Sequence, residues 1–355
     1  MGKVTRFFLG SNSEHGFHSL YDNFASGAED FLYIIKAGPG TGKSTFMRKI
    51  GKAAEEKGYD VEYILCSGDP DSLDGVYIPA LHVGWADGTA PHVMDPVYFG
   101  ADGAYLDLGR FCDTKGVRTH RKEITDLTQR YRGEYAKAYA YTAAAGRVDN
   151  VVCDGFFSRE ILEKVKKRAN SAIRREFGTK HAGTPGEVVK RFLSAVSCKG
   201  KVFLADTLKP LCQRVYLVEN QCGLAESYLQ IILEAGLASG ANALLCPTPL
   251  RPNALEAVLF PELGVGFIAD APGQTIPGVE EKWVHLDAIP NKDLIRSNRA
   301  LLRTQAKEKA ALVDTAQNYL RRAKALHDEL EAYYRPYLDI DRLNSFTERH
   351  IDGIL

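Results

Sequence analysis

The chain has 355 residues, 45% of them hydrophobic and 25% charged, which is typical of a globular protein long enough for two domains. Its 45 Lys and Arg residues balance 45 Asp and Glu residues, so net charge gives no reason to expect nucleic acid or an anionic membrane as a partner. The sequence shows no signal peptide or membrane-spanning run, and its seven scattered cysteines include no CxxC pair, which favours a reducing cytoplasm.

The first predicted element that carries chemistry is a strand, a loop and a helix in succession. Residues 31–35 form a short apolar run that is typical of a buried parallel strand. Phe46, Ile50 and Ala53 then recur at helical spacing, and Gly58 suits a helix end. Between strand and helix the sequence reads A-G-P-G-T-G-K-S, a phosphate-binding loop with alanine in place of its first glycine.

The residue types in this loop match the chemistry of a nucleotide. Glycines at 38, 40 and 42 permit backbone angles that side chains forbid, and they let N–H groups surround phosphates at the positive end of the helix. We expect Lys43 to reach the β- and γ-phosphates and Ser44 to coordinate Mg²⁺, whereas Thr45 also suits a local capping role. The residues predicted to bind ATP and Mg²⁺ are Gly38, Pro39, Gly40, Thr41, Gly42, Lys43, Ser44 and Thr45.

A phosphate loop also needs an acidic residue at the end of a neighbouring strand, which holds magnesium directly or through water. Two apolar runs end in aspartate, one at Asp87 and the other at Asp154. We favour Asp87, because it follows another apolar run, residues 61–66, and the order strand, helix, strand, strand is compact. Asp154 follows a long helical stretch that its apolar neighbours could simply continue.

His92 lies five residues beyond the favoured aspartate, where it could position water or sense the γ-phosphate. The simpler alternative is that His92 and Asp95 shape a proline-flanked turn. Asp69 and Asp71 could contact a ligand, but aspartates before a helix more often cap it. The predicted catalytic residues are Lys43, Asp87 and His92, and the predicted metal ligands are Ser44 and Asp87.

The later part of the chain repeats this outline. Residues 32–46 align with residues 215–229 at a constant difference of 183, which places Lys43 opposite Glu226. The match continues between Cys66 and Cys246, between residues 79–87 and 261–270, and more loosely between residues 5–17 and 190–202. We therefore predict an α/β protein made by tandem duplication, with two P-loop NTPase-like three-layer α/β/α domains. The predicted boundaries are residues 1–165 for the first domain, 166–189 for a linker and 190–355 for the second domain.

The second copy is expected to fold like the first but to hold no triphosphate. Gln221 and Ala225 put side chains where two glycines stood, and Glu226 replaces the cation. A carboxylate about 4 Å from a phosphate charge is unfavourable by roughly 4 kcal/mol at an effective dielectric near 20. We therefore predict one active nucleotide site, in the first repeat.

Two long helical arms are predicted, one in each repeat. Residues 293–334 contain no Gly or Pro and have apolar residues at helical spacing, and residues 118–148 are similar apart from two glycines. The arms could pair with each other, pack on the sheets or serve as a lid. Residues 159–180 hold eight basic and three acidic residues, which favours a solvated helix face over a nucleic-acid site.

The motifs "GPGTGKST", a preceding "GF…LYDNF", and "DGTAPH" after a strand resemble a poorly characterised bacterial family of duplicated P-loop ATPases. The resemblance covers nearly the whole chain, and it implies ATP binding at residues 38–45. Relatives can carry a recognisable phosphate loop in the later repeat too, and this chain departs from them there.

The leading hypothesis is a Mg²⁺-dependent ATPase whose second repeat is a degenerate partner domain. An arginine from repeat two, or Arg110, Arg118 or Arg121, could complete the site. A small-molecule or nucleotide kinase is the first alternative, and a nucleotide-gated regulator with negligible turnover is the second. The sequence leaves the acceptor, any protein partner and the oligomeric state open.

Overall fold

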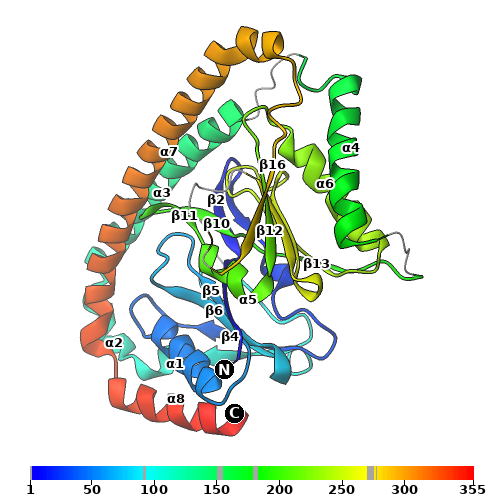
Figure 1. Ribbon diagram of the computed structural model, residues 1–355. Helices are drawn as coiled ribbons and strands as arrows, with labels where there is room; N and C mark the ends of the chain where they lie inside the picture. Colours follow the sequence, from blue (N-terminus) through cyan, green and yellow to red (C-terminus); the bar gives the residue numbers. More distant parts are fainter. Residues whose placement is uncertain (1, 91–92, 150–154, 179–182, 270–275, 277) are drawn as a thin grey trace.

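The computed structural model describes the chain apart from residues 1, 91–92, 150–154, 179–182, 270–275 and 277. The described residues form two six-stranded mixed sheets and eight α-helices (Figure 1). None of these helices is both long enough and apolar enough to cross a membrane. The protein is therefore an α/β protein, as the sequence predicted.

The two sheets have the same strand order. The first is ordered β1-β5-β6-β7-β4-β8 and the second β9-β13-β14-β15-β12-β16. In each sheet only the third strand runs antiparallel to its neighbours. The bounds in the first sheet are β1 Val4–Phe8, β4 Phe31–Lys36, β5 Val61–Leu65, β6 Leu73–Ile78, β7 Val83–Asp87 and β8 Gly103–Asp107. Those in the second are β9 Val188–Lys190, β12 Arg214–Val218, β13 Ala243–Pro247, β14 Leu255–Phe260, β15 Val265–Ala269 and β16 Glu280–Val284. This agreement is what a duplicated chain predicts.

A pair of hairpins joins the two halves at their centre. The first hairpin is β2 Gly10–Ser13 with β3 Gly16–Ser19, and the second is β10 Ser194–Ser197 with β11 Gly200–Phe203. Just before them, Phe8 and Phe192 exchange two backbone hydrogen bonds, of 3.0 and 2.9 Å. The hairpins begin at Gly10 and Ser194, a difference of 184, which makes Phe8 the equivalent of Phe192 and shows that the looser alignment of residues 5–17 with 190–202 was one residue out. Because equivalent residues pair with each other here, the two halves are related by an approximate two-fold axis.

The inner faces of the two sheets pack into one shared core. Ile64 and Ala86 of the first sheet lie in the same buried cluster as Val215, Leu259 and Ile268 of the second. We expected each sheet to be covered by helices on both faces, so this part of the prediction is wrong. Helices cover the outer faces, and the other half of the molecule covers the inner ones, because the alternating apolar residues of each strand need a partner on both sides.

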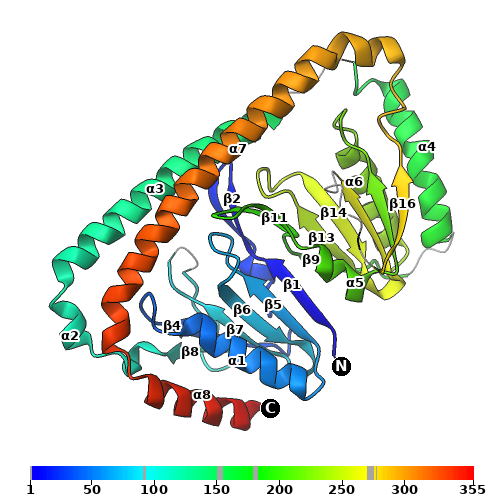
Figure 2. The same cartoon turned by 60° about the vertical axis from the view of Figure 1, so that its left-hand side comes forward.

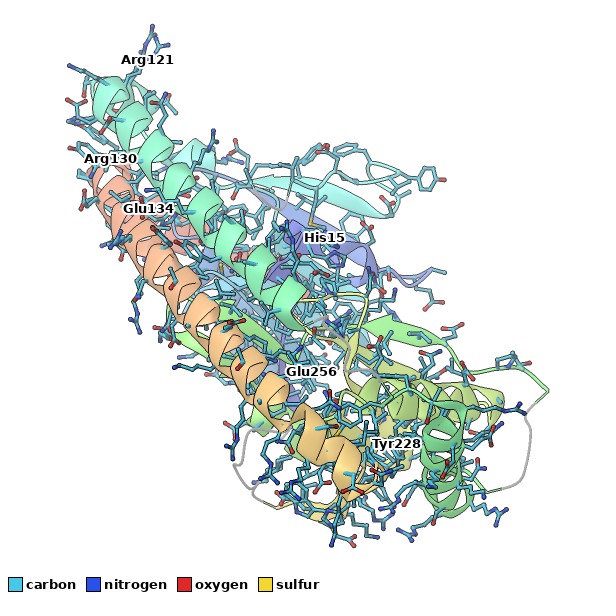
Figure 3. All side chains as sticks on the ribbon, turned by 90° about the horizontal axis from the view of Figure 1, so that it is seen from above. His15, Arg121, Arg130, Glu134, Tyr228 and Glu256 are labelled. Carbon is cyan, nitrogen blue, oxygen red and sulfur yellow. The ribbon has the colours of Figure 1, made fainter. Side chains whose placement is uncertain are left out.

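The two predicted arms form an antiparallel pair of helices, α3 Arg121–Asp149 and α7 Lys292–Tyr334, along one edge of the molecule (Figures 1 and 3). Tyr141 stacks on Tyr319 with ring centroids 5.5 Å apart, and His120 lies 5.2 Å from the ring of Tyr333. Arg121, Arg130 and Glu134 follow one another along α3 (Figure 3). The long helix predicted over residues 293–334 is confirmed.

The helix that follows each arm packs on the sheet of the other repeat. The remaining helices are α1 Lys43–Glu56, α2 Thr114–Arg118, α4 Arg159–Glu176, α5 Leu208–Leu211, α6 Ala225–Ala238 and α8 Ile340–Ile354. Helix α8 packs against α1 of the first repeat, where Phe346 stacks on Phe46, and α4 packs against α6 of the second (Figure 2). The first part of the segment predicted as a linker, residues 166–189, is therefore packed helix, because α4 extends to Glu176 and buries Ala169 and Ala172.

Candidate functional site

The glycine-rich loop, residues 37–42, connects β4 to α1 in the first repeat (Figure 1). Gly40 has φ of 64° and Gly42 has φ of 87°, so both are in the left-handed region that side chains disfavour. Gly42 is also the residue that precedes α1, and its carbonyl accepts from the Phe46 N–H at 2.8 Å. The glycine spacing therefore turns the chain sharply and aims the N-terminal end of α1 at the loop.

Lys43 and Asp87 face each other beside this loop. Lys43 is the first residue of α1, and its Nζ lies 2.8 Å from the Gly38 carbonyl and 3.6 Å from Asp87 Oδ2. Their side chains are only 12% and 14% exposed, so water screens this ion pair weakly. The sequence predicted that these two residues share a site, and the structure brings them together.

Asp87 is held by its own strand end. It is the last residue of β7 and pairs with Ile35 of β4, the strand that leads into the loop. Its Oδ1 accepts from the backbone N–H of Thr89 at 2.9 Å and from the Thr89 hydroxyl at 2.6 Å. Because these bonds fix one carboxylate oxygen, the other is directed at Lys43.

The other predicted loop residues differ in their surroundings. Ser44 Oγ accepts from the backbone N–H of Leu73, at the start of β6, at 2.9 Å. Thr41 is buried and its hydroxyl donates to the Gly38 carbonyl at 2.7 Å, whereas Thr45 is exposed and Pro39 partly buried. Thr41 thus stabilises the loop from within.

Of the remaining candidates, His92 and Asp154 lie outside the described residues. Asp95 accepts from the Tyr105 hydroxyl at 2.8 Å and lies 3.7 Å from Lys36, so it shapes the surface beside β8. Asp69 and Asp71 pair with lysines of repeat two, Lys324 at 3.3 Å and Lys199. These last contacts join the repeats and give the two aspartates a structural role.

A second buried carboxylate lies beside the site and was missed from the sequence. Asp74 is an extra residue in β6, because Gly75 pairs with Ile64 and Leu73 with Leu65. Such bulges re-aim a side chain, and here the carboxylate is directed into the interior. Burial and then the charge of Asp74 raise the pKa of Tyr21 well above its usual value. Glu256 occupies the same bulge in repeat two, and Ser194 donates to it at 2.6 Å.

Repeat two also contributes a cover over the glycine-rich loop. A Cβ added at Gly38, Gly40 or Gly42 would lie 2.9 Å from a side-chain atom of Tyr334, Glu331 or Leu343, respectively. These three residues belong to the end of α7 and the start of α8. No local sequence signal reports this contact, because it joins residues some three hundred positions apart.

The counterpart loop, residues 219–224, precedes α6 and has six residues, as the first loop does. Between equivalent buried positions, however, the chain is one residue shorter from Val218 to Tyr228 than from Ile35 to Phe46. Strand positions such as Ile35 and Val218 match at a difference of 183, since each pairs with the last residue of the neighbouring strand. The buried helix positions match at 182, as in Phe46 and Tyr228. The counterpart of Lys43 is therefore Ala225, and the alignment that placed Glu226 there was one residue out.

The same comparison corrects two other equivalences. Ala269 pairs with Val218 as Asp87 pairs with Ile35, so alanine stands at the position of the acid. Asp270, which the sequence alignment matched with that acid, lies outside the described residues. Cys246 takes the bulge position of Ile64 and not that of Cys66. Repeat two thus has alanine at both positions of the Lys43–Asp87 pair.

A carboxylate of the protein itself fills the counterpart loop. Asp287 accepts from the backbone N–H of Cys222 at 3.0 Å and from that of Gln221 at 3.1 Å. Asn220 accepts from the Ala225 N–H at 3.0 Å, and Glu226 is turned toward Arg251 at 3.5 Å. The groups that would bind an anion in this loop are already satisfied internally.

Comparisons of the chain with protein-family models, with curated proteins and with solved structures return no match.

Proposed function

We propose that the protein is a Mg²⁺-dependent, ATP-binding NTPase with one nucleotide site, in the first repeat. The observation that carries this proposal is the pair formed by Lys43, the first residue of α1, and Asp87, the last residue of β7, beside a loop with two left-handed glycines. The resemblance of the loop sequence to P-loop ATPases supports the same function. In repeat two, alanines at both equivalent positions and the Asp287 contacts support a count of one site.

The residues at the site fit both ligands. Backbone N–H groups at the N-terminal end of α1 and the ammonium of Lys43 suit phosphate oxygens. The Ser44 hydroxyl and the Asp87 carboxylate are hard oxygen donors of the kind that Mg²⁺ prefers. Bound there, the metal would neutralise charge that develops on the phosphates. The low exposure of Lys43 and Asp87 would exclude bulk water and strengthen both charges.

Phosphate release from ATP by the wild type, Lys43→Ala and Asp87→Asn tests this function. A charge-assisted hydrogen bond contributes about 1.5–3 kcal/mol, so Lys43→Ala should weaken ATP binding about 10- to 100-fold. Asp87→Asn should abolish the Mg²⁺ dependence of turnover. Asp107→Asn is the matched control, because Asp107 ends the neighbouring strand β8 and is exposed. Equal phosphate release from the wild type and Lys43→Ala would contradict the proposal.

The same assay separates the related functions. Phosphate release that depends on ATP alone indicates a hydrolase. ADP formation that requires an added acceptor and releases no phosphate indicates a kinase. Tight ATP binding with turnover at background level indicates a nucleotide-gated regulator.

A further inference from the structure

The closing segment, residues 327–343, runs from the last turns of α7 to the first turn of α8 and lies over the glycine-rich loop. Glu331 contacts Gly40 through its backbone as well as its side chain, because an added Cβ would lie 3.2 Å from Glu331 Cα. Tyr334 and Leu343 contact the loop on either side of this point. The segment belongs to repeat two, whereas the loop and the Lys43–Asp87 pair belong to repeat one.

Two attachments hold the closing segment in place. At its centre, the Asp113 N–H donates to the Tyr337 carbonyl and the Asp339 N–H donates to the Phe111 carbonyl, both at 2.8 Å. Cys112 and Leu338 are opposite each other between these bonds. Beyond it, α8 is anchored by the Trp85 indole N–H, which donates to His350 Nε2 at 2.9 Å.

The carboxylate of Glu331 is paired within the closing segment while the segment covers the loop, and its negative charge would oppose a nucleotide bound there. The Glu331 carboxylate lies 2.9 Å from Arg335 and 3.5 Å from His327. Burial lowers the pKa of His327, the nearby carboxylates of Glu331 and Asp328 act against this, and the positive charges of Lys324 and Lys43 lower it further. Phosphates bound in the loop would bring several negative charges toward Glu331, which contacts Gly40, and like charges repel.

We propose that the closing segment is a lid, which must lift from the glycine-rich loop for a nucleotide to enter or leave. Within the lid, the short 3-10 turn η6, Arg335–Tyr337, contains Pro336 and separates α7 from α8, and the backbone hydrogen bonds beside it must break when the lid lifts. Repeat two, which has no nucleotide site of its own, thereby controls the site of repeat one. This inference rests on the proposed function.

A single substitution can lock the lid. Cys112 and Leu338 form a non-hydrogen-bonded antiparallel pair, whose Cα atoms are about 4.5 Å apart, within the range that a disulfide spans. Leu338→Cys therefore allows a disulfide with the native Cys112. The rate of association with a fluorescent ATP analogue is then measured for oxidised and reduced protein.

If the segment is a lid, oxidised Leu338→Cys associates with nucleotide at least about tenfold more slowly, and a reductant restores the rate. Leu338→Ser under the same oxidant is the control, since it loses the same side chain but cannot form the disulfide. Thermal unfolding of the oxidised protein shows that it remains folded. Equal rates for the oxidised and reduced forms would overturn the lid and leave the nucleotide site intact. If no form binds nucleotide, including the wild type, the proposed function fails and the lid with it.

Discussion

The glycine-rich loop and its counterpart follow equivalent strands and precede equivalent helices, but different groups complete them. In repeat one, Lys43 and Asp87 face each other across the loop. In repeat two, alanines stand at both positions, and Asp287 accepts from two loop amides. The helix start needs an anion or another acceptor in both repeats. In repeat two that acceptor is Asp287 of the chain itself, and under the proposed function the phosphates of a bound nucleotide would be the acceptor in repeat one.

The two loops also differ in what covers them. Gly40 is in close contact with Glu331 of the closing segment, whereas the atom nearest a Cβ at Gly223 would be a ring carbon of Phe157, at 3.6 Å. Both glycines have positive φ, of 64° and 73°. Both positions therefore favour glycine because of their left-handed backbone. Only in repeat one does the neighbouring packing also leave no room for a side chain.

The largest predicted effect separates these two requirements. Gly40→Ala should lower the free energy of unfolding by about 1–2 kcal/mol for the left-handed φ and by about 1–3 kcal/mol more for the overlap with Glu331. Gly223→Ala should lose only the first amount, because a methyl group fits there. Denaturant unfolding of both variants measures the difference.

Glu331→Gly provides the control for the packing contribution. In the Gly40→Ala background it removes the overlapping side chain and should recover part of the loss, at the cost of about 1 kcal/mol for glycine inside a helix. Equal destabilisation by Gly40→Ala and Gly223→Ala would mean that the closing segment does not constrain the loop.

A smaller effect is expected at Asp287. Asp287→Ala leaves the amides of Gln221 and Cys222 without their acceptor, which should destabilise the protein by about 1–3 kcal/mol. Asp287→Asn retains an acceptor oxygen and should lose less. The number of ATP molecules bound, measured by calorimetry, should stay at one, because Ala225 supplies no cation. A second bound nucleotide in Asp287→Ala would show that Asp287 alone blocks repeat two.

The sequence was sufficient to predict the strand–loop–helix conformation at the first loop, the proximity of Lys43 and Asp87, and two halves with the same strand order. The loop pattern lies within eight consecutive residues, and Asp87 ends an apolar run that the strand period makes visible. The loop motif and the strand period both report local backbone conformation. Residues close together in the sequence determine that conformation, so it can be predicted without knowing the tertiary structure. The second buried acid, Asp74, was missed because a bulge leaves no mark in the apolar pattern.

The arrangement of the two repeats could not be predicted in the same way. An apolar face on α4 or α8 shows that the helix packs on something, but both sheets offer equivalent faces, so the sequence does not choose between them. The sequence alignment at a constant difference of 183 residues placed Lys43 opposite Glu226 instead of Ala225 for a related reason. The connection from Val218 to Tyr228 is one residue shorter than that from Ile35 to Phe46, and the buried positions of α6 are what reveal this shift.

The smallest predicted effect is a pH dependence of stability. It distinguishes α8 from α4, the two helices that each pack on the sheet of the other repeat. Burial lowers the pKa of His350 on α8, and its Nε2 accepts from Trp85, so the docked helix requires neutral histidine. Because the folded-state pKa lies below the unfolded value near 6.5, the unfolded chain binds more protons in the window between them. The contribution of the Trp85–His350 hydrogen bond to the free energy of unfolding is therefore fully present above about pH 6.5. It is lost as the pH is lowered through that window, and the loss is about 0.5–1.5 kcal/mol.

His350→Gln tests this dependence, because glutamine can accept from Trp85 but does not titrate. Burial also lowers the pKa of His18 and His327, so the wild type should lose stability between pH 7.5 and 5.5 from several groups together. The variant should lose measurably less over the same range in denaturant unfolding. Helix α4 contains no histidine, so its docking should not add to the effect. An identical pH dependence in the variant would show that acid does not act on stability through His350.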